Sequence, residues 1–293
     1  MANLKEIRTR IASVKSTQQI TSAMKMVSAA KLRKSQTAIT LLRPYANKMS
    51  EIIARLGEAM TDDIPFTRHP NQKQENILLI VLTSNKGLCS TFNSSIIKLS
   101  TKRINEYKLA GHDISVVSYG KKGDNALSKM ADIHYLGTND DVWDTLTFDS
   151  IKNEAGKSVN EFLEKKYDRI EIIYNQFKNA ANQIPKIESF LPLLIKGNEN
   201  TTGEDIKYNN DYIFAPSKEE IITSVIPQSL NTQMYRCFLD SFTSEHGARM
   251  SSMNKATDNA MALLKDLTLN YNKQRQADIT NQIIEVSSGA NAV

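Results

Sequence analysis

The chain has 293 residues, of which 40% are hydrophobic and 24% are charged, the composition of an ordinary folded protein. This length allows one large domain or two smaller ones. No stretch approaches the ~20 consecutive apolar residues of a membrane-spanning helix, so we expect no direct membrane span. The first residues lack the apolar core of a secretion signal, and we therefore expect a cytoplasmic protein.

Positive charge is concentrated near the N-terminus. The net charge is +5, yet residues 1–56 hold eleven Lys and Arg against two acidic residues, which leaves +9 there and −4 elsewhere. The partner of this segment is therefore expected to be acidic: nucleic acid, an anionic membrane or an acidic protein surface. The run Lys31-Leu32-Arg33-Lys34 favours a solvated helix face over nucleic-acid binding, because no aromatic residue that could stack on bases occurs before Tyr45.

The N-terminal stretch has helical periodicity over an unusual length. From Leu4 to Leu56 there is no glycine and one proline, Pro44, and apolar residues recur at three- and four-residue steps. A helix of that extent would reach roughly 80 Å at 1.5 Å per residue. Pro44 should bend it, because the proline ring removes one backbone donor and clashes with the preceding turn.

The C-terminal stretch has the same character, with no proline after Pro227. The expected heptad seam is apolar in its middle and polar or small towards both ends, and the N-terminal helix likewise has Gln18 and Thr21 in its seam. Two such helices can pair antiparallel, each covering the apolar stripe of the other. The expected seam runs Phe242, His246, Arg249, Met253, Ala256, Ala260, Leu263, Leu267, Asn270, Gln274 and Ala277.

The middle of the chain alternates strand and helix patterns. Strands are expected over residues 77–83, 114–119 and 169–174, with helices over 92–109, 124–130 and 151–166 and an edge hairpin formed by 187–194 and 212–214. The sequence thus predicts an α/β protein: a long antiparallel coiled coil of N- and C-terminal helices, residues 1–57 and 218–293, with an inserted Rossmann-like α/β domain, residues 74–215.

Patterns that could carry catalysis are weak. Gly156-Lys157-Ser158 lies inside a helical stretch and lacks the earlier glycine of a phosphate-binding loop. Ser84-Asn85-Lys86-Gly87 follows a strand, where ligands bind in α/β domains, but its single glycine favours a tight turn. The histidines are scattered, and Cys89 and Cys237 are expected to be reduced and buried. We expect no catalytic site, no cofactor and no metal.

Longer strings resemble a known family. The opening Leu4-Lys5-Glu6-Ile7-Arg8 and the segment Thr17–Val27 are similar to the start of the ATP synthase gamma subunit, as is Arg43-Pro44-Tyr45. The segment Thr83–Cys89 resembles the family's first strand and turn. The C-terminal strings Ala248-Arg249-Met250 and Leu267–Thr280 carry the most specific resemblance.

The resemblance implies a rotating central stalk with no catalytic site of its own, which couples proton flow through the membrane c-ring to ATP synthesis or hydrolysis. The coiled coil would stand inside a hexameric ring of alpha and beta subunits, and the α/β domain would contact the epsilon subunit and the c-ring. Contacts with beta would include Met24, Lys25, Arg249, Gln276 and Thr280. The absence of a convincing transit peptide favours a bacterial enzyme, at the cytoplasmic face of the inner membrane.

One position departs from the family. After Ile279-Thr280 the family usually has a glutamate where this chain has Gln282, so an ionic contact there is in doubt. For Met24, coiled-coil packing is as good an explanation as contact with beta. Two rival hypotheses remain: a nucleic-acid-binding coiled-coil protein, which would bind with steep salt dependence, and an α/β enzyme with helical dimerisation arms, which would need converging titratable residues.

Overall fold

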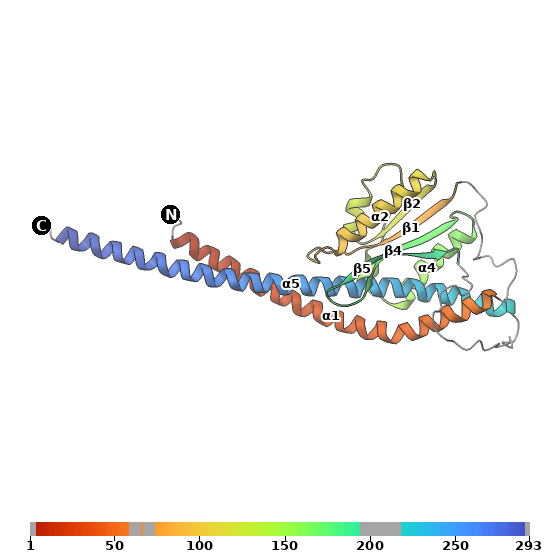
Figure 1. Ribbon diagram of the computed structural model, residues 1–293, viewed down its shortest axis with the longest axis horizontal. Helices are drawn as coiled ribbons and strands as arrows, with labels where there is room; N and C mark the ends of the chain where they lie inside the picture. Colours follow the sequence, from red (N-terminus) through yellow and green to blue (C-terminus); the bar gives the residue numbers. More distant parts are fainter. Residues whose placement is uncertain (1–3, 59–65, 67–73, 194–217, 291–293) are drawn as a thin grey trace, which may run out of the picture. The chain divides into compact units, whose positions relative to one another are not determined.

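The computed structural model describes residues 4–58, 66, 74–193 and 218–290. It contains the long helices α1 (Leu4–Glu58) and α5 (Lys218–Ala290) and, between them in the chain, a five-stranded sheet with its helices (Figure 1). By internal contacts the chain divides into two compact units: a smaller one of residues 1–30 and 249–293, and a larger one of residues 31–248. Both long helices contribute to each unit.

The two long helices confirm the sequence prediction. α1 continues through Pro44 and α5 through Pro227. On α1 the buried and half-buried residues recur every three or four positions, as they do at Leu32, Ser35, Ile39, Leu42, Ala46 and Met49. This stripe is the period of a helix with one covered face.

The sheet lies in the larger unit and has the strand order β3-β2-β1-β4-β5. Strands β1 (Asn76–Leu82), β2 (Asp113–Tyr119), β3 (His134–Thr138) and β4 (Arg169–Phe177) are parallel, with Asn76 opposite Asp113 and Ile77 opposite Arg169. β5 (Gln183–Leu191) pairs antiparallel with β4. This is the order of a doubly wound fold with an antiparallel edge strand.

Helices cover both faces of the sheet, which explains the continuous apolar run of β1. Ile77, Leu79 and Val81 belong to one buried cluster with residues of α2 (Phe92–Leu109) and α3 (Lys121–Leu127). Leu78, Ile80 and Leu82 belong to another, with residues of α4 (Phe148–Leu163) and of α5. Alternate side chains of a strand point to opposite faces, so a strand covered on both sides must be apolar throughout.

Several boundaries differ from the predictions. α3 begins and ends three residues before the predicted 124–130, and α4 lies three residues before the predicted 151–166. α4 starts where it does because Thr147 and Ser150 form a capping box, in which Thr147 Oγ1 accepts from the Ser150 N–H. Strand β3 was not predicted. β5 pairs with β4 on one edge, and the segment 212–214, predicted to form a hairpin with it, lies outside the described residues.

Two glycines of the sequence Gly120-Lys121-Lys122-Gly123 allow α3 to pack tightly on the end of β1. Gly120 has a φ of +119°, and a Cβ there would lie 2.4 Å from the Thr83 carbonyl oxygen. A Cβ on Gly123 would lie 2.4 Å from Ser118 Oγ. Glycine is therefore required at both positions by this close approach.

Candidate functional site

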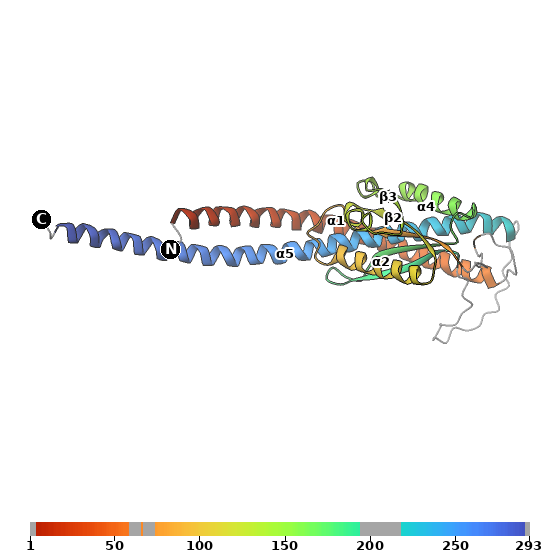
Figure 2. The same ribbon diagram turned by 90° about the horizontal axis from the view of Figure 1, so that it is seen from above.

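In the smaller unit, residues 4–30 of α1 and 249–290 of α5 form an antiparallel pair (Figure 2). Thr257 Oγ1 and Thr21 Oγ1 are joined by a hydrogen bond of 2.9 Å, and the Lys25 ammonium donates to Asn254 Oδ1. The partner on α5 moves back along the chain as the residue on α1 moves forward, which fixes the antiparallel direction. Asn254 Nδ2 in turn donates to Asp258 Oδ2 at 3.1 Å.

These five residues form a polar belt across the seam of the helix pair. Gln18 and Thr21 are half-buried on the same stripe as Leu4, Ile7, Ile11 and Val14, as the sequence predicted. Polar groups in a seam bury little apolar area but fix the register of two helices, because a slipped register would leave their hydrogen bonds unmade. The belt therefore contributes register more than stability.

The seam of α5 departs from the predicted one beyond Met253. The covered residues step by four from Arg249 to Met253 and again to Thr257, whereas a heptad alternates steps of four and three. The second step of four shifts the covered stripe onto Leu264, Tyr271 and Asp278, so the predicted Leu263, Asn270 and Ala277 are exposed. Such a phase change locally unwinds the supercoil, because the stripe follows the straight helix more closely.

The five residues expected to contact beta do not form one cluster. Met24 and Lys25 are half-buried at the helix pair, and Lys25 is engaged by Asn254. Arg249 is 6% exposed. Gln276 and Thr280 are exposed one turn apart, and the Thr280 hydroxyl donates to the Gln276 carbonyl. Because a helix rises 1.5 Å per residue, Arg249 and Gln276 lie about 40 Å apart along α5.

A patch that the sequence reasoning missed lies near the end of α5. Ile279, Ile283, Ile284 and Val286 are 47%, 63%, 56% and 73% exposed. Contiguous exposed apolar side chains of this size mark a surface that another molecule covers. The signal was present in the sequence as large aliphatic residues past the point where the helix pair needs them.

Basic side chains line the exposed face of α1. Arg8, Arg10, Lys15, Arg33 and Lys34 are all exposed. Arg10 forms an ion pair of 2.9 Å with Glu6, an exposed (i, i+4) contact that contributes little. The exposed face of α1 is thus suited to an acidic surface.

The edge of the sheet where α/β domains bind nucleotides is closed by internal hydrogen bonds. The Ser84 N–H donates to Asn93 Oδ1, the Lys121 N–H to Asn85 Oδ1, and the Gly123 N–H to Thr83 Oγ1. These three backbone donors are therefore already used and cannot also hold a phosphate. Gly156-Lys157-Ser158 lies inside α4, in a helical stretch as the sequence predicted.

The described residues do not meet the requirements of a disulfide, a metal site or a membrane-spanning helix. Cys89 and Cys237 are buried cysteines that are not joined in a disulfide, as predicted. Within residues 4–58, 66, 74–193 and 218–290, no group of His, Cys, Asp and Glu side chains could hold a metal ion. No helix in that same part of the chain is long and apolar enough to cross a membrane.

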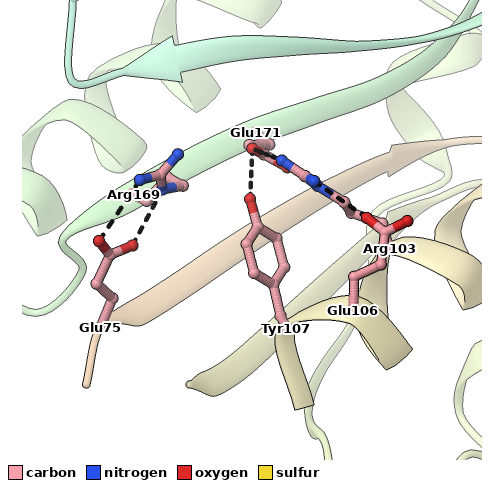
Figure 3. A network of polar contacts seen from close by, with 6 residues as sticks. All are labelled: Glu75, Arg103, Glu106, Tyr107, Arg169 and Glu171. Atoms are coloured by element: carbon pink, nitrogen blue, oxygen red, sulfur yellow. Dashed lines mark hydrogen bonds and ion pairs between the residues drawn. The ribbon is translucent and has the colours of Figure 1, made fainter. Parts of the chain in front are cut away.

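A network of charged and polar side chains fastens α2 to the sheet (Figure 3). Glu171 of β4 is 3% exposed and accepts from Arg103 Nε at 3.0 Å, from Arg103 Nη2 at 2.7 Å and from the Tyr107 hydroxyl. Burial and the Glu171 carboxylate raise the pKa of Tyr107. Nearby, Arg169 Nε donates to Glu75 at 3.1 Å. These charged groups are bonded to one another, so the cluster attaches α2 to the sheet and does not form a reactive site.

Comparison with known proteins gives one consistent result. The family model described as ATP synthase matches residues 3–293. The ATP synthase gamma chain of Flavobacterium johnsoniae is 50% identical over 293 residues, covering 100% of this chain and 99% of the relative. That of Flavobacterium psychrophilum is also 50% identical, over 294 residues, with the same coverage.

A solved structure shares the fold. A chain of the Euglena gracilis mitochondrial ATP synthase, in an assembly of OSCP, F1 and c-ring, has a TM-score of 0.65 and 21% identity, covering 99% of this chain and 94% of that chain. At this identity the likeness shows the fold alone, whereas the family match and the 50% identity span the full sequence. The chain belongs to the ATP synthase gamma chain family, whose members are non-catalytic subunits.

Proposed function

We propose that this chain is the rotating central shaft of a bacterial F-type ATP synthase, which couples proton flow through the membrane c-ring to ATP synthesis, or to hydrolysis in reverse. ATP chemistry would take place in the surrounding ring of alpha and beta subunits. The epsilon subunit and the c-ring would hold the larger unit, and the complex would lie at the cytoplasmic face of the bacterial inner membrane.

The observation that carries this proposal is the uncovered apolar patch near the end of α5. Ile283 and Val286 are 63% and 73% exposed, which is costly in water unless a partner covers them. A ring that surrounds the helix pair would bury this patch from all sides. The basic face of α1 would meet an acidic sleeve, and exposed charge pairs of about 0–1 kcal/mol each would attract the shaft without locking it.

Coupling requires that each orientation of the shaft favours one state of the ring over the others. The helix pair has distinct faces, since the basic side of α1 and the apolar end of α5 are different surfaces. Met24, Lys25, Arg249, Gln276 and Thr280 are proposed contacts with beta. Gln276 and Thr280 are the most accessible, whereas Arg249 at 6% exposure has only a small part of its side chain available.

The test is to co-express the chain with the alpha and beta subunits of the same genome, purify the complex and measure ATP hydrolysis. We expect the three proteins to co-purify and the activity to depend on this chain. Ile283→Asp should lower the yield of complex, because it places a charge in the apolar patch that the ring would bury. The matched control Asn272→Asp adds the same charge at an exposed site of α5 and should have little effect. Equal yields for the two variants, or no co-purification with the parent, would contradict the proposal.

A further inference from the structure

Arg43 joins three elements of the larger unit. Its Nη2 atom donates to the carbonyl of Phe177, the last residue of β4, at 3.1 Å and lies 3.6 Å from Asp240 Oδ1 of α5. Arg43 itself belongs to α1 and immediately precedes Pro44. Proline has no N–H, so α1 lacks one helical hydrogen bond at this point and is locally weak. The single guanidinium therefore ties α1 to α5 and to β4 where α1 is easiest to open.

One oxygen of the carboxylate that pairs with Arg43 lacks a hydrogen bond from the described residues. Asp240 is 2% exposed, and among the described residues no donor lies within hydrogen-bond distance of its Oδ1 atom. A buried carboxylate normally accepts several hydrogen bonds, because burial removes its water. The Arg43 contact at 3.6 Å is an ion pair longer than a hydrogen bond, so it compensates only part of that cost.

The groups around Asp240 explain why it stays poorly satisfied. It faces Arg43 from α1, Arg236 and Cys237 from α5, and Glu188 from β5. Glu188 engages Arg236 and also accepts from Tyr174 of β4 at 2.7 Å and from Gln233 at 3.0 Å. Arg236 is thus oriented towards Glu188, and its Nε atom has no hydrogen-bond acceptor among the described residues.

Burial raises the pKa of Asp240 to about 6, with Arg43 and Arg236 acting in the opposite direction. The carboxyl group is therefore ionised in mildly alkaline solution and protonated in mildly acidic solution. Arg43 keeps its charge throughout, and its side chain is half exposed.

We propose that Arg43 and Asp240 form a latch that holds α1 on α5 and opens when Asp240 takes up a proton. In the closed state the ion pair and the bond to the Phe177 carbonyl act together. Protonation removes the negative charge, leaves Arg43 with the carbonyl alone, and lets its guanidinium turn towards water. The segment of α1 around Pro44 then separates from α5 more readily, while the sheet remains folded.

The latch differs from a merely structural ion pair in the sign of two effects. Because folding raises the pKa of Asp240, protonation stabilises the folded state as a whole, and global stability due to this group rises as the pH falls through about 6. The attachment of α1 nevertheless weakens over the same interval, because in the separated state Asp240 would stay covered by α5 and β5 but lose Arg43, and would therefore bind the proton more tightly than in the closed state. With an ordinary stabilising ion pair, global stability and the attachment of α1 would both decrease as the pH falls.

The test is hydrogen–deuterium exchange on the full-length chain at about pH 8 and about pH 5, corrected for the intrinsic pH dependence of exchange. In the parent we expect residues 36–49 to lose about tenfold in protection at the lower pH, the size of a charged contact, while residues 77–82 of β1 lose none. Asp240→Asn, which cannot ionise, should show low protection of residues 36–49 at both pH values. The control Asp266→Asn changes an exposed carboxylate of α5 and should behave as the parent.

A second variant protects the test against a failure of Asp240→Asn to fold. Arg43→Gln removes the half-exposed partner and should likewise give low, pH-independent protection of residues 36–49. The proposal is overturned if the parent shows no loss of protection in this segment at low pH. It is equally overturned if either latch variant keeps the parent's pH dependence. None of these outcomes requires the other subunits, so they are independent of the proposed rotary function.

Discussion

Different interactions stabilise the two units of the chain internally. The larger unit has a sheet with apolar clusters on both faces, in which Ile77, Ile80 and Phe238 are fully buried. The smaller unit is a pair of helices with one seam, most of whose members are only half-buried beyond Ala260. Because stabilisation follows the apolar area removed from water, the larger unit resists unfolding through its core, and the smaller unit relies on a narrow stripe and a polar belt.

Substitutions in the two units should therefore affect different properties of the chain. A core substitution should threaten folding of the larger unit, whereas a substitution in the helix pair should leave folding nearly intact and alter what the pair contacts. A surface that must turn inside a partner gains from shallow contacts of this kind, since deep interlocking would trap one orientation.

The largest expected effect is in the core of the larger unit. Phe238 is 0% exposed, and its ring meets Tyr119 edge-on at 4.9 Å and Trp143 at 5.4 Å between centroids. Phe238→Ala should lower the free energy of unfolding by about 3–5 kcal/mol, because it removes buried ring contacts and leaves a cavity. Urea unfolding of the full chain measures this, and a loss below about 1 kcal/mol would contradict the packing described.

The next effect concerns Asp240, a buried charge of the larger unit whose Oδ1 atom lacks a hydrogen-bond donor among the described residues. Asp240→Asn should raise the free energy of unfolding by roughly 1–3 kcal/mol at about pH 8, because it removes a buried carboxylate whose pKa is raised. At a pH near 4 the parent carboxyl is protonated in the fold, so the gain should vanish. Urea unfolding at the two pH values provides the measurement, and a variant that is less stable than the parent at high pH would show that the Arg43 pair outweighs the burial cost.

A smaller effect is expected in the seam of the helix pair. Leu264 is half-buried on the observed stripe and absent from the predicted one, so Leu264→Ala should cost about 1 kcal/mol, less than a core leucine would. Leu263, which is 48% exposed and lies on the stripe first predicted, serves as the matched control. Helix content against temperature measures both, and a larger loss for Leu263→Ala would restore the unshifted heptad.

The smallest effect on stability, and the most informative for function, is expected at Met24. Met24→Lys should change the free energy of unfolding by less than about 1 kcal/mol, because the side chain is half-buried and a lysine stem can reach water. It should nevertheless impair coupling in the complex, because it adds a positive charge beside Lys25. Proton pumping per ATP hydrolysed in membrane vesicles is the readout, and equal ratios in variant and parent would contradict the proposed contact with beta.

Much of the fold could be predicted from sequence periodicity. The two long helices and strand β1 were predictable because their patterns of apolar residues are uninterrupted. The helical pattern reflects burial on one face, and the continuous apolar run of β1 reflects burial on both faces. Strand β3 was missed because it is a short edge strand whose sequence contains Gly137 and whose residues are only partly covered.

The site was less predictable, for physical reasons. The phase shift after Met253 depends on which neighbour each residue packs against, and the seam residues on either side are similar in size and polarity. The exposed apolar patch at Ile283 and Val286 could have been read from the sequence, once α1 was known to leave those side chains uncovered. The latch of Arg43 and Asp240 joins residues of different elements, and no local pattern indicates that contact.

Rotation of the chain within a ring of partner subunits can be observed with a probe attached to the chain. Leu109, the last residue of α2, is 91% exposed, so Leu109→Cys offers a site for attaching a probe without disturbing the core. With the alpha and beta subunits immobilised, we predict that ATP drives rotation of the probe in one direction. An assembled complex that hydrolyses ATP at the full rate while the probe stays fixed would contradict the account.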